Sequence, residues 1–275
     1  MNLAAFFVLG PHTQAMSIQR VIPTDLESGL QLLPEHPFGK LKNAFESKYE
    51  LRLEVELAMA ALLERLNPSD RGTRFLTGGG YEWIMAVACW ASGIQVIPGG
   101  HSENGFDLLE YMESLKGLWS IKSFTGETLS GSLRIINKMS PNDVEFQHPT
   151  VFISPGLPGL TLLDPALAPK YAKMVTQNDE AVSISGSLVR KFAEDNPDFV
   201  IPFIAPINQG NGRESPQLDI VASILTSGTY PNLGPVMNRM RQIATTVSFL
   251  RKQYQSGEID EPTFKNLLSN LEKNQ

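Results

Sequence analysis

Hydrophobic and polar residues follow two different periods along this chain, and the change from one period to the other predicts its layout. Apolar side chains recur at three- and four-residue spacing over residues 39–66 and again over residues 81–92, as they do in helices that pack on a core. Alternation over residues 49–57 also fits a strand, but the length of the segment and the run AMAALLERL favour a helix. The pair Asn67-Pro68 is typical of the end of a helix.

Short runs rich in β-branched and aromatic residues come next, with Gly, Asn and Ser clusters between them. The predicted strands are residues 94–98, 106–109, 118–124, 133–136 and 151–154. Helical spacing returns over residues 165–175 and 182–195. Residues 199–205 are apolar again, but Pro202 interrupts them, which predicts an edge or irregular strand.

The last part of the chain is predicted to be helical. A helix over residues 235–254 is followed by a Gly-containing turn and a second helix over residues 261–274. Asp260 is placed to accept hydrogen bonds from the first turn of that helix, and Pro262 suits the same turn.

These patterns predict an α/β core of residues 39–210 between an irregular N-terminal segment, 1–38, and a helical C-terminal module, 211–275. Of the 275 residues, 42% are hydrophobic, which is enough for a core and excludes a wholly disordered chain. The one cysteine, Cys89, lies in an apolar run and is expected to be buried. It excludes an internal disulfide framework and a cysteine-rich zinc site.

The charge balance limits the partners of the chain. A formal net charge of −6 gives no overall attraction to nucleic acid, so such binding needs a local patch or a metal ion. The apolar run at residues 3–10 has no basic residue before it and is too short to span a bilayer. An extension upstream of a start at Met16, or a terminal strand, explains it better than a signal peptide, so we expect a cytoplasmic protein without a membrane partner.

Three polar side chains stand in otherwise apolar, strand-like surroundings. Asp107 follows Gly105 at the start of one predicted strand, and Ser120 and Lys122 lie on the next, with Lys122 15 positions after Asp107. Because side chains alternate along a strand, Ser120 and Lys122 share a face. If the Asp107 strand pairs alongside, the three groups converge at one sheet edge, where each needs a partner or a metal to offset its burial.

Together with Glu82 on the preceding helix, this order resembles the PD-(D/E)XK nuclease superfamily, the fold of many restriction endonucleases. Its pattern is a helix with Glu, a strand with Asp, and a strand with acid-x-Lys, matched here by Glu82, Asp107 and Lys122. The resemblance implies a mixed central sheet flanked by helices. Ser120 stands where Asp or Glu is usual, so the second carboxylate comes from Glu82, Glu110 or Glu127, with Glu82 favoured because family members use that helix.

The resemblance also implies a function: hydrolysis of DNA phosphodiester bonds by a type II restriction or phage-defence endonuclease. Asp107 and Glu82 would hold Mg²⁺, for which Mn²⁺ is expected to substitute, while Lys122 activates water and Ser120 supports the site. Duplex cleavage needs two sites, so a homodimer or higher homo-oligomer is expected. The basic residues expected to contact DNA phosphates are Lys116, Arg134 and Lys138.

The C-terminal string LRKQYQSGEIDEPTFKNLLSNLEKN resembles the short helical hairpin called SHOCT. This second resemblance implies a small module for oligomerisation or docking. It leaves open that the chain is an assembly protein acting through these helices, or an inactive nucleic-acid-binding or regulatory protein on a nuclease-like fold.

Simpler interpretations stand beside these. Asp107 can end a turn, Lys122 can extend from a strand edge, and Glu82 can face solvent on its helix. His148 lacks the spacing of a metal ligand, as do the other histidines, and His101 fits a loop position without function. The triple glycine at residues 78–80 lacks the Lys-Ser/Thr of a phosphate-binding loop, so a hinge before the second helix is favoured.

Overall fold

The computed structural model describes residues 26–66, 74–99, 105–111, 115–124, 131–137, 146–177, 181–204, 228 and 230–273. Its helices are α1 (Pro37–Ser47), α2 (Tyr49–Arg65), α3 (Arg74–Ala91), α4 (Pro169–Ala172), α5 (Gly186–Asp195), the 3-10 turn η1 (Pro197–Phe199), α7 (Leu233–Gln255) and α8 (Glu261–Lys273). Its strands are β1 (Val96–Pro98), β2 (Leu108–Glu110), β3 (Lys116–Ser123), β4 (Ser132–Asn137), β5 (Thr150–Ile153), β6 (Gly159–Leu163), β7 (Thr176–Gln177), β8 (Ala181–Ser185) and β9 (Val200–Pro202).

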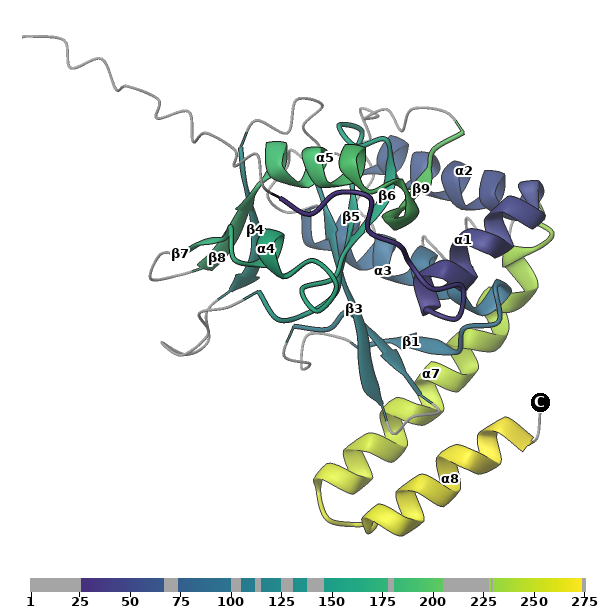
Figure 1. Ribbon diagram of the computed structural model, residues 1–275. Coiled ribbons are helices and arrows are strands. Elements are labelled where there is room, and N and C mark those ends of the chain that lie inside the picture. The colour runs from purple at the N-terminus through teal and green to yellow at the C-terminus, as the bar shows by residue number, and fades with distance from the viewer. Residues whose placement is uncertain are drawn as a thin grey trace, which may run out of the picture.

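The described strands form two sheets, which Figure 1 shows among the helices. The larger has the order β1-β2-β3-β5-β6-β9 and is mixed, because β3 and β5 run parallel while every other neighbouring pair is antiparallel. The smaller, β4-β8-β7, is antiparallel. A mixed α/β fold with a mixed sheet and C-terminal helices is therefore confirmed, and β9 is an edge strand, as Pro202 predicted.

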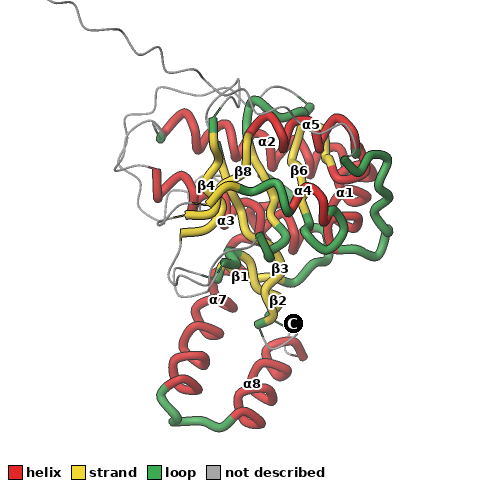
Figure 2. The backbone as a smooth tube through the Cα atoms, turned by 60° about the vertical axis from the view of Figure 1, so that its left-hand side comes forward, coloured by secondary structure: helices red, strands yellow, loops and turns green. Residues whose placement is uncertain are grey.

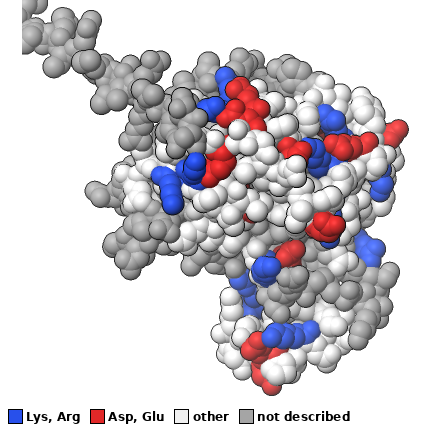
Figure 3. All heavy atoms as spheres, in the orientation of Figure 1, with Lys and Arg blue, Asp and Glu red and all other residues white. Residues whose placement is uncertain are grey.

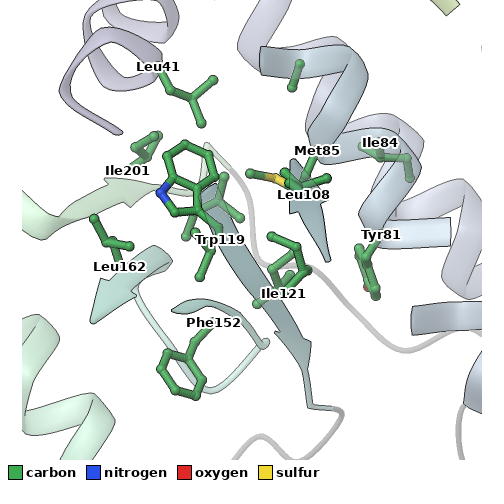
Figure 4. Packing of buried hydrophobic residues seen from close by; sticks show 14 of the residues in the cluster. Leu41, Tyr81, Ile84, Met85, Leu108, Trp119, Ile121, Phe152, Leu162 and Ile201 are labelled. Atoms are coloured by element: carbon green, nitrogen blue, oxygen red, sulfur yellow. The ribbon is translucent and has the colours of Figure 1, made fainter. Parts of the chain in front are cut away.

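Strand β3 lies inside the larger sheet, between β2 and β5, and its two faces carry different side chains. Trp119 and Ile121 are buried on one face. Figure 4 shows Trp119 near Leu41 of α1, and Ile121 on the side where Tyr81 of α3 lies. Trp119 also meets Phe38 edge to face, with ring centroids 5.9 Å apart. Alternation leaves the other face of β3 to Ser120 and Lys122.

Helix α7 belongs to two hydrophobic clusters. Its first half packs into the main core through Leu233, Met237 and Met240. Its second half joins α8 and the β1–β2 edge in a smaller cluster made of Ile97, Leu109, Tyr111, Ile243, Val247, Leu250, Phe264 and Leu268. In Figure 2 the two helices extend from the body as a hairpin. The predicted cap of α8 is confirmed, since the Thr263 N–H donates to the Asp260 carboxylate at 2.9 Å.

Several predicted elements need correction. The first helical stretch is two helices, α1 and α2, and the alternative strand over residues 49–57 is wrong. The glycines at residues 78–80 do not precede a helix but lie inside α3. The packing explains this, because a Cβ on Gly80 would lie 2.6 Å from Leu62 Cδ2, so the glycine lets α2 and α3 approach closely.

The second half of the core also differs from its predicted pattern. Residues 181–185 form β8 and only the rest of that predicted helix is helical, because the sequence AVSIS alternates and pairs with β4. The predicted helix over residues 165–175 shrinks to α4, and β6 was not predicted at all. Cys89 is fully buried, as expected. No helix in the described ranges is long and apolar enough to cross a membrane.

Candidate active site

Asp107 lies directly before β2, and backbone hydrogen bonds on both sides fix its position. Its N–H donates to the Trp119 carbonyl of β3 at 2.9 Å, and its carbonyl accepts from the Gly99 N–H at 2.8 Å. The ladder between β2 and β3 is irregular between Leu108 and Leu109. Asp107 is therefore held by strand-like pairing at the position where its side chain can reach along β3.

One carboxylate oxygen of Asp107 collects three donors from β3. Asp107 Oδ2 accepts hydrogen bonds from Ser120 Oγ at 2.9 Å, from the Ile121 N–H at 2.6 Å and from Lys122 Nζ at 3.1 Å. The predicted convergence of Asp107, Ser120 and Lys122 is thus confirmed, but it lies inside the larger sheet and not at its edge. Within the described residues, Asp107 Oδ1 accepts no hydrogen bond, so half of this carboxylate keeps its ligand-binding capacity.

Lys122 is only partly exposed, and the Asp107 carboxylate compensates its charge. The exposed fractions of the two side chains are 26% for Lys122 and 22% for Asp107. An ammonium has three N–H donors, and the contact with Asp107 uses one of them. The other two can bind a further acceptor beside the carboxylate.

Glu82 of α3 lies close enough to this pair to respond to both charges. The pKa of Glu82 is raised to about 7, mostly by burial and also by the negative charge of Asp107, while the Lys122 charge partly opposes the shift. No residue in the described part of the chain donates a hydrogen bond to this carboxylate. A half-buried acid without a donor has its charged form disfavoured, which is the physical cause of the shift.

These two carboxylates fit a divalent cation in chemistry. Oxygen ligands suit Mg²⁺, and a cation between Asp107 and Glu82 would relieve the repulsion that disfavours the charge on Glu82. Within the described residues there is no group of three or more His, Cys, Asp or Glu side chains placed to hold a metal. A cation here would therefore keep several water ligands, as Mg²⁺ usually does.

Among the described residues, the other predicted site residues do not join this cluster. Lys116 is exposed at the opposite end of β3 from Lys122, about 20 Å away at the usual rise of a strand. Glu110, an alternative second carboxylate, pairs in register with Lys116 at that far end. Arg134 is exposed on β4, in the smaller sheet. Lys138 and the other positions named from the sequence, Glu127 and His101, lie outside the described residues.

His148 belongs to the surroundings of the site, although its sequence spacing gave no reason to choose it. It comes just before β5, whose parallel pairing sets Thr150 opposite Ser120. The Ser120 N–H donates to the carbonyl of Pro149 at 2.9 Å. Burial lowers the pKa of His148, and the Lys122 charge lowers it further, which keeps the imidazole neutral. Only the β3–β5 pairing, which is not visible in the local sequence, brings it here.

On the face that Figure 3 shows, the described residues form no large patch of one charge sign. Lys and Arg lie next to Asp and Glu there, among wide uncharged areas. This mixture agrees with the net charge of −6 and leaves any recognition of an anion to local groups.

Comparisons with models of protein families, with curated proteins and with solved structures found no match to this chain.

Proposed function

We propose that this protein is a metal-dependent endonuclease that hydrolyses DNA phosphodiester bonds, as a cytoplasmic restriction or phage-defence enzyme on a restriction-endonuclease-like fold. One observation carries the proposal: Asp107 Oδ2 binds both Ser120 and Lys122 while Glu82 responds to the charges of this pair. The order of a helix with Glu82, a strand start with Asp107 and a strand with Ser120 and Lys122 supports it. So does the mixed sheet in which β3 is central.

Mg²⁺ held by Asp107 and Glu82 would supply Lewis-acid polarisation of the scissile phosphate and lower the pKa of a bound water. Lys122 then has two tasks that its position allows. The two N–H donors that do not bind Asp107 would orient the attacking water, and the charge of Lys122 would stabilise the negative charge that develops on phosphorus-bound oxygens. A compact ammonium suits this position beside a carboxylate, whereas a planar guanidinium at residue 122 does not.

Ser120 positions the carboxylate in this scheme. Its side chain is buried, with 2% exposed, and its hydroxyl donates to Asp107 Oδ2, so it orients Asp107 instead of replacing the missing acid. Glu82 is the carboxylate that replaces it. With a pKa of about 7, Glu82 gives up its proton readily when a cation is present at neutral pH.

The test is plasmid cleavage with Mg²⁺ and with Mn²⁺, comparing wild type with Asp107→Asn, Lys122→Ala and Lys122→Arg. We expect metal-dependent fragments from wild type and a loss of at least about a hundredfold in rate for each of the three variants. Lys191→Ala is the matched control. Lys191 forms a similar ion pair with Asp195, at 2.7 Å on α5, and its removal should leave the rate unchanged. Cleavage that survives both Asp107→Asn and Lys122→Ala would falsify the assignment.

A second candidate is a DNA-binding protein without catalysis on the same fold. The observation that favours it is that Lys122 already pairs with Asp107 Oδ2, so that the charge of this carboxylate is compensated without a metal. Isothermal titration with Mg²⁺ and Mn²⁺ separates the two. The endonuclease should bind the ion with an affinity that Glu82→Gln lowers, whereas the inactive protein should show no difference between wild type and this variant.

A further inference from the structure

His148 is held in one orientation beside the site. Its ring lies 4.3 Å from the Phe106 ring, centroid to centroid, at an interplanar angle of 59°. The ring also lies against Gly105, where a Cβ would lie 2.3 Å from His148 Cδ2 and 2.5 Å from Nε2. Phe106 and Gly105 are the two residues before Asp107, so the segment that positions the carboxylate also packs against the imidazole.

This packing fixes the ring without using its polar atoms. Within the described part of the chain, neither ring nitrogen of His148 takes part in a hydrogen bond, since the polar contact of this residue is made by its carbonyl, which accepts from Thr150 Oγ1 at 2.9 Å. A neutral imidazole carries one N–H donor and one acceptor. An oriented, half-buried ring with both groups unused is suited to a ligand that the described residues do not supply.

We propose that His148 is a further substrate-binding residue of this site, donating a ring N–H to a phosphate oxygen of the nucleic-acid backbone next to Lys122. The proposal rests on the endonuclease function above and deepens it. Phosphate oxygens only accept hydrogen bonds, so the N–H is the group of the neutral ring that can bind them, while Lys122 provides the positive charge. The parallel pairing of β3 with β5 places the two donors on neighbouring strands.

Gly105 supplies a test that leaves His148 itself unchanged. Gly105→Ala places a methyl group where the imidazole lies and so displaces the ring, and it also strains a backbone with φ +85°. Gly93→Ala imposes the same strain at φ +80°, but nothing lies within 4 Å of the added Cβ. The pair separates displacement of His148 from the cost of the backbone conformation.

The experiment measures two quantities: binding of a fluorescent duplex oligonucleotide in EDTA, followed by anisotropy, and cleavage with Mg²⁺. His148→Ala should weaken binding about tenfold, the effect of one hydrogen bond to a charged group. His148→Asn places an amide N–H near Nδ1 and His148→Gln near Nε2, so one of them should restore most of the affinity. Gly105→Ala should bind as weakly as His148→Ala, and Gly93→Ala as tightly as wild type. Urea unfolding midpoints check that each variant is folded.

Each outcome decides between the two proposals. If wild type cuts and His148→Ala binds and cuts equally well, the His148 proposal fails and the endonuclease stands. If wild type binds without cutting and His148→Ala weakens binding, the endonuclease fails and the His148 proposal stands. Equal losses in Gly93→Ala and Gly105→Ala, or a loss of kcat alone that neither amide restores, overturn the proposed phosphate contact. Absence of binding by wild type overturns both.

Discussion

Two neighbouring helices each carry a glutamate into the protein, and the two carboxylates have opposite surroundings. Glu54 of α2 is 5% exposed and accepts hydrogen bonds from the backbone N–H groups of Asn232 and Leu233, each at 3.0 Å, and from the Asn232 amide. Glu82 of α3 accepts none from the described residues, and its pKa is raised to about 7. The described residues supply hydrogen-bond donors to Glu54 and none to Glu82.

The difference indicates a separate role for each carboxylate. The first N–H groups of a helix have no partner within it, and the Asn232 side chain does not cap α7. The Glu54 carboxylate caps α7 instead. The hydrogen bonds that it accepts offset the cost of its burial and join α7 to the core. At Glu82 no hydrogen bond from the described residues offsets the cost of burying an acid, which is typical of a ligand-binding site. Lack of partners, not burial, is what separates a candidate functional carboxylate from a structural one.

The largest change in stability should come from replacing Glu54. Glu54→Ala leaves several buried donors at the start of α7 without an acceptor, and we expect it to lower the free energy of unfolding by about 3 to 4 kcal/mol. Glu54→Gln keeps one acceptor oxygen and should cost about half as much. Urea denaturation followed by circular dichroism measures both. An unchanged midpoint for Glu54→Ala would mean that α7 does not depend on this cap.

Replacing Glu82 should have the opposite effect and raise the free energy of unfolding. In the unfolded chain Glu82 ionises near 4.5, and in the folded protein near 7, so the folded state loses stability as the pH rises from 4.5 to 7 and carries the full cost above 7. Glu82→Gln removes that cost. The variant should be more stable than wild type by about 2 kcal/mol at pH 8, a value reduced by partial exposure, and equal to it at pH 4.

Urea midpoints across this pH range test the contrast. The gain in Glu82→Gln must grow with pH, because it tracks ionisation of the wild-type side chain. A gain that is the same at pH 4 and pH 8 would come from packing instead, and a loss at pH 8 would show that the Glu82 carboxylate has a partner that stabilises its charge.

The comparison also shows which features can be predicted from local sequence. Asp107, Ser120 and Lys122 could be placed together because strand alternation fixes which side chains share a face, and a short connection brings β2 next to β3. Asp260 could be placed because a cap lies beside its own helix. In both cases the interacting residues are close in sequence or linked by one hairpin.

The interactions that the sequence did not reveal are long-range. Glu54 and Asn232 are 178 positions apart, and no local pattern pairs them. His148 reaches the site only through the parallel pairing of β3 with β5. Residues 182–185 were predicted to begin a helix, but the pairing of β8 with β4 makes them part of a strand.

The smallest predicted effect concerns the interface between the two helices that carry these acids. Gly79 and Gly80 are adjacent in α3, but a Cβ on Gly79 meets nothing within 4 Å, whereas one on Gly80 would meet the buried side chain of Leu62. Alanine favours a helix over glycine, so Gly79→Ala should stabilise the protein by about 0.5 to 1 kcal/mol. Gly80→Ala gains the same helix propensity but must displace Leu62, and a net loss of about 1 kcal/mol is expected.

Urea midpoints of the two single variants provide the measurement, with each glycine as the control for the other. Both substitutions add one methyl group to the same helix, so any shared effect on the unfolded chain cancels in their difference. Opposite signs would show that only Gly80 is needed for packing of α2 on α3. A gain from both would show that Leu62 moves aside at little cost, and a loss from both would mean that Gly79 also has a close neighbour. In the expected case α3 keeps Gly79 at a measurable cost in stability, one turn before Glu82, whose carboxylate accepts no hydrogen bond from the described residues.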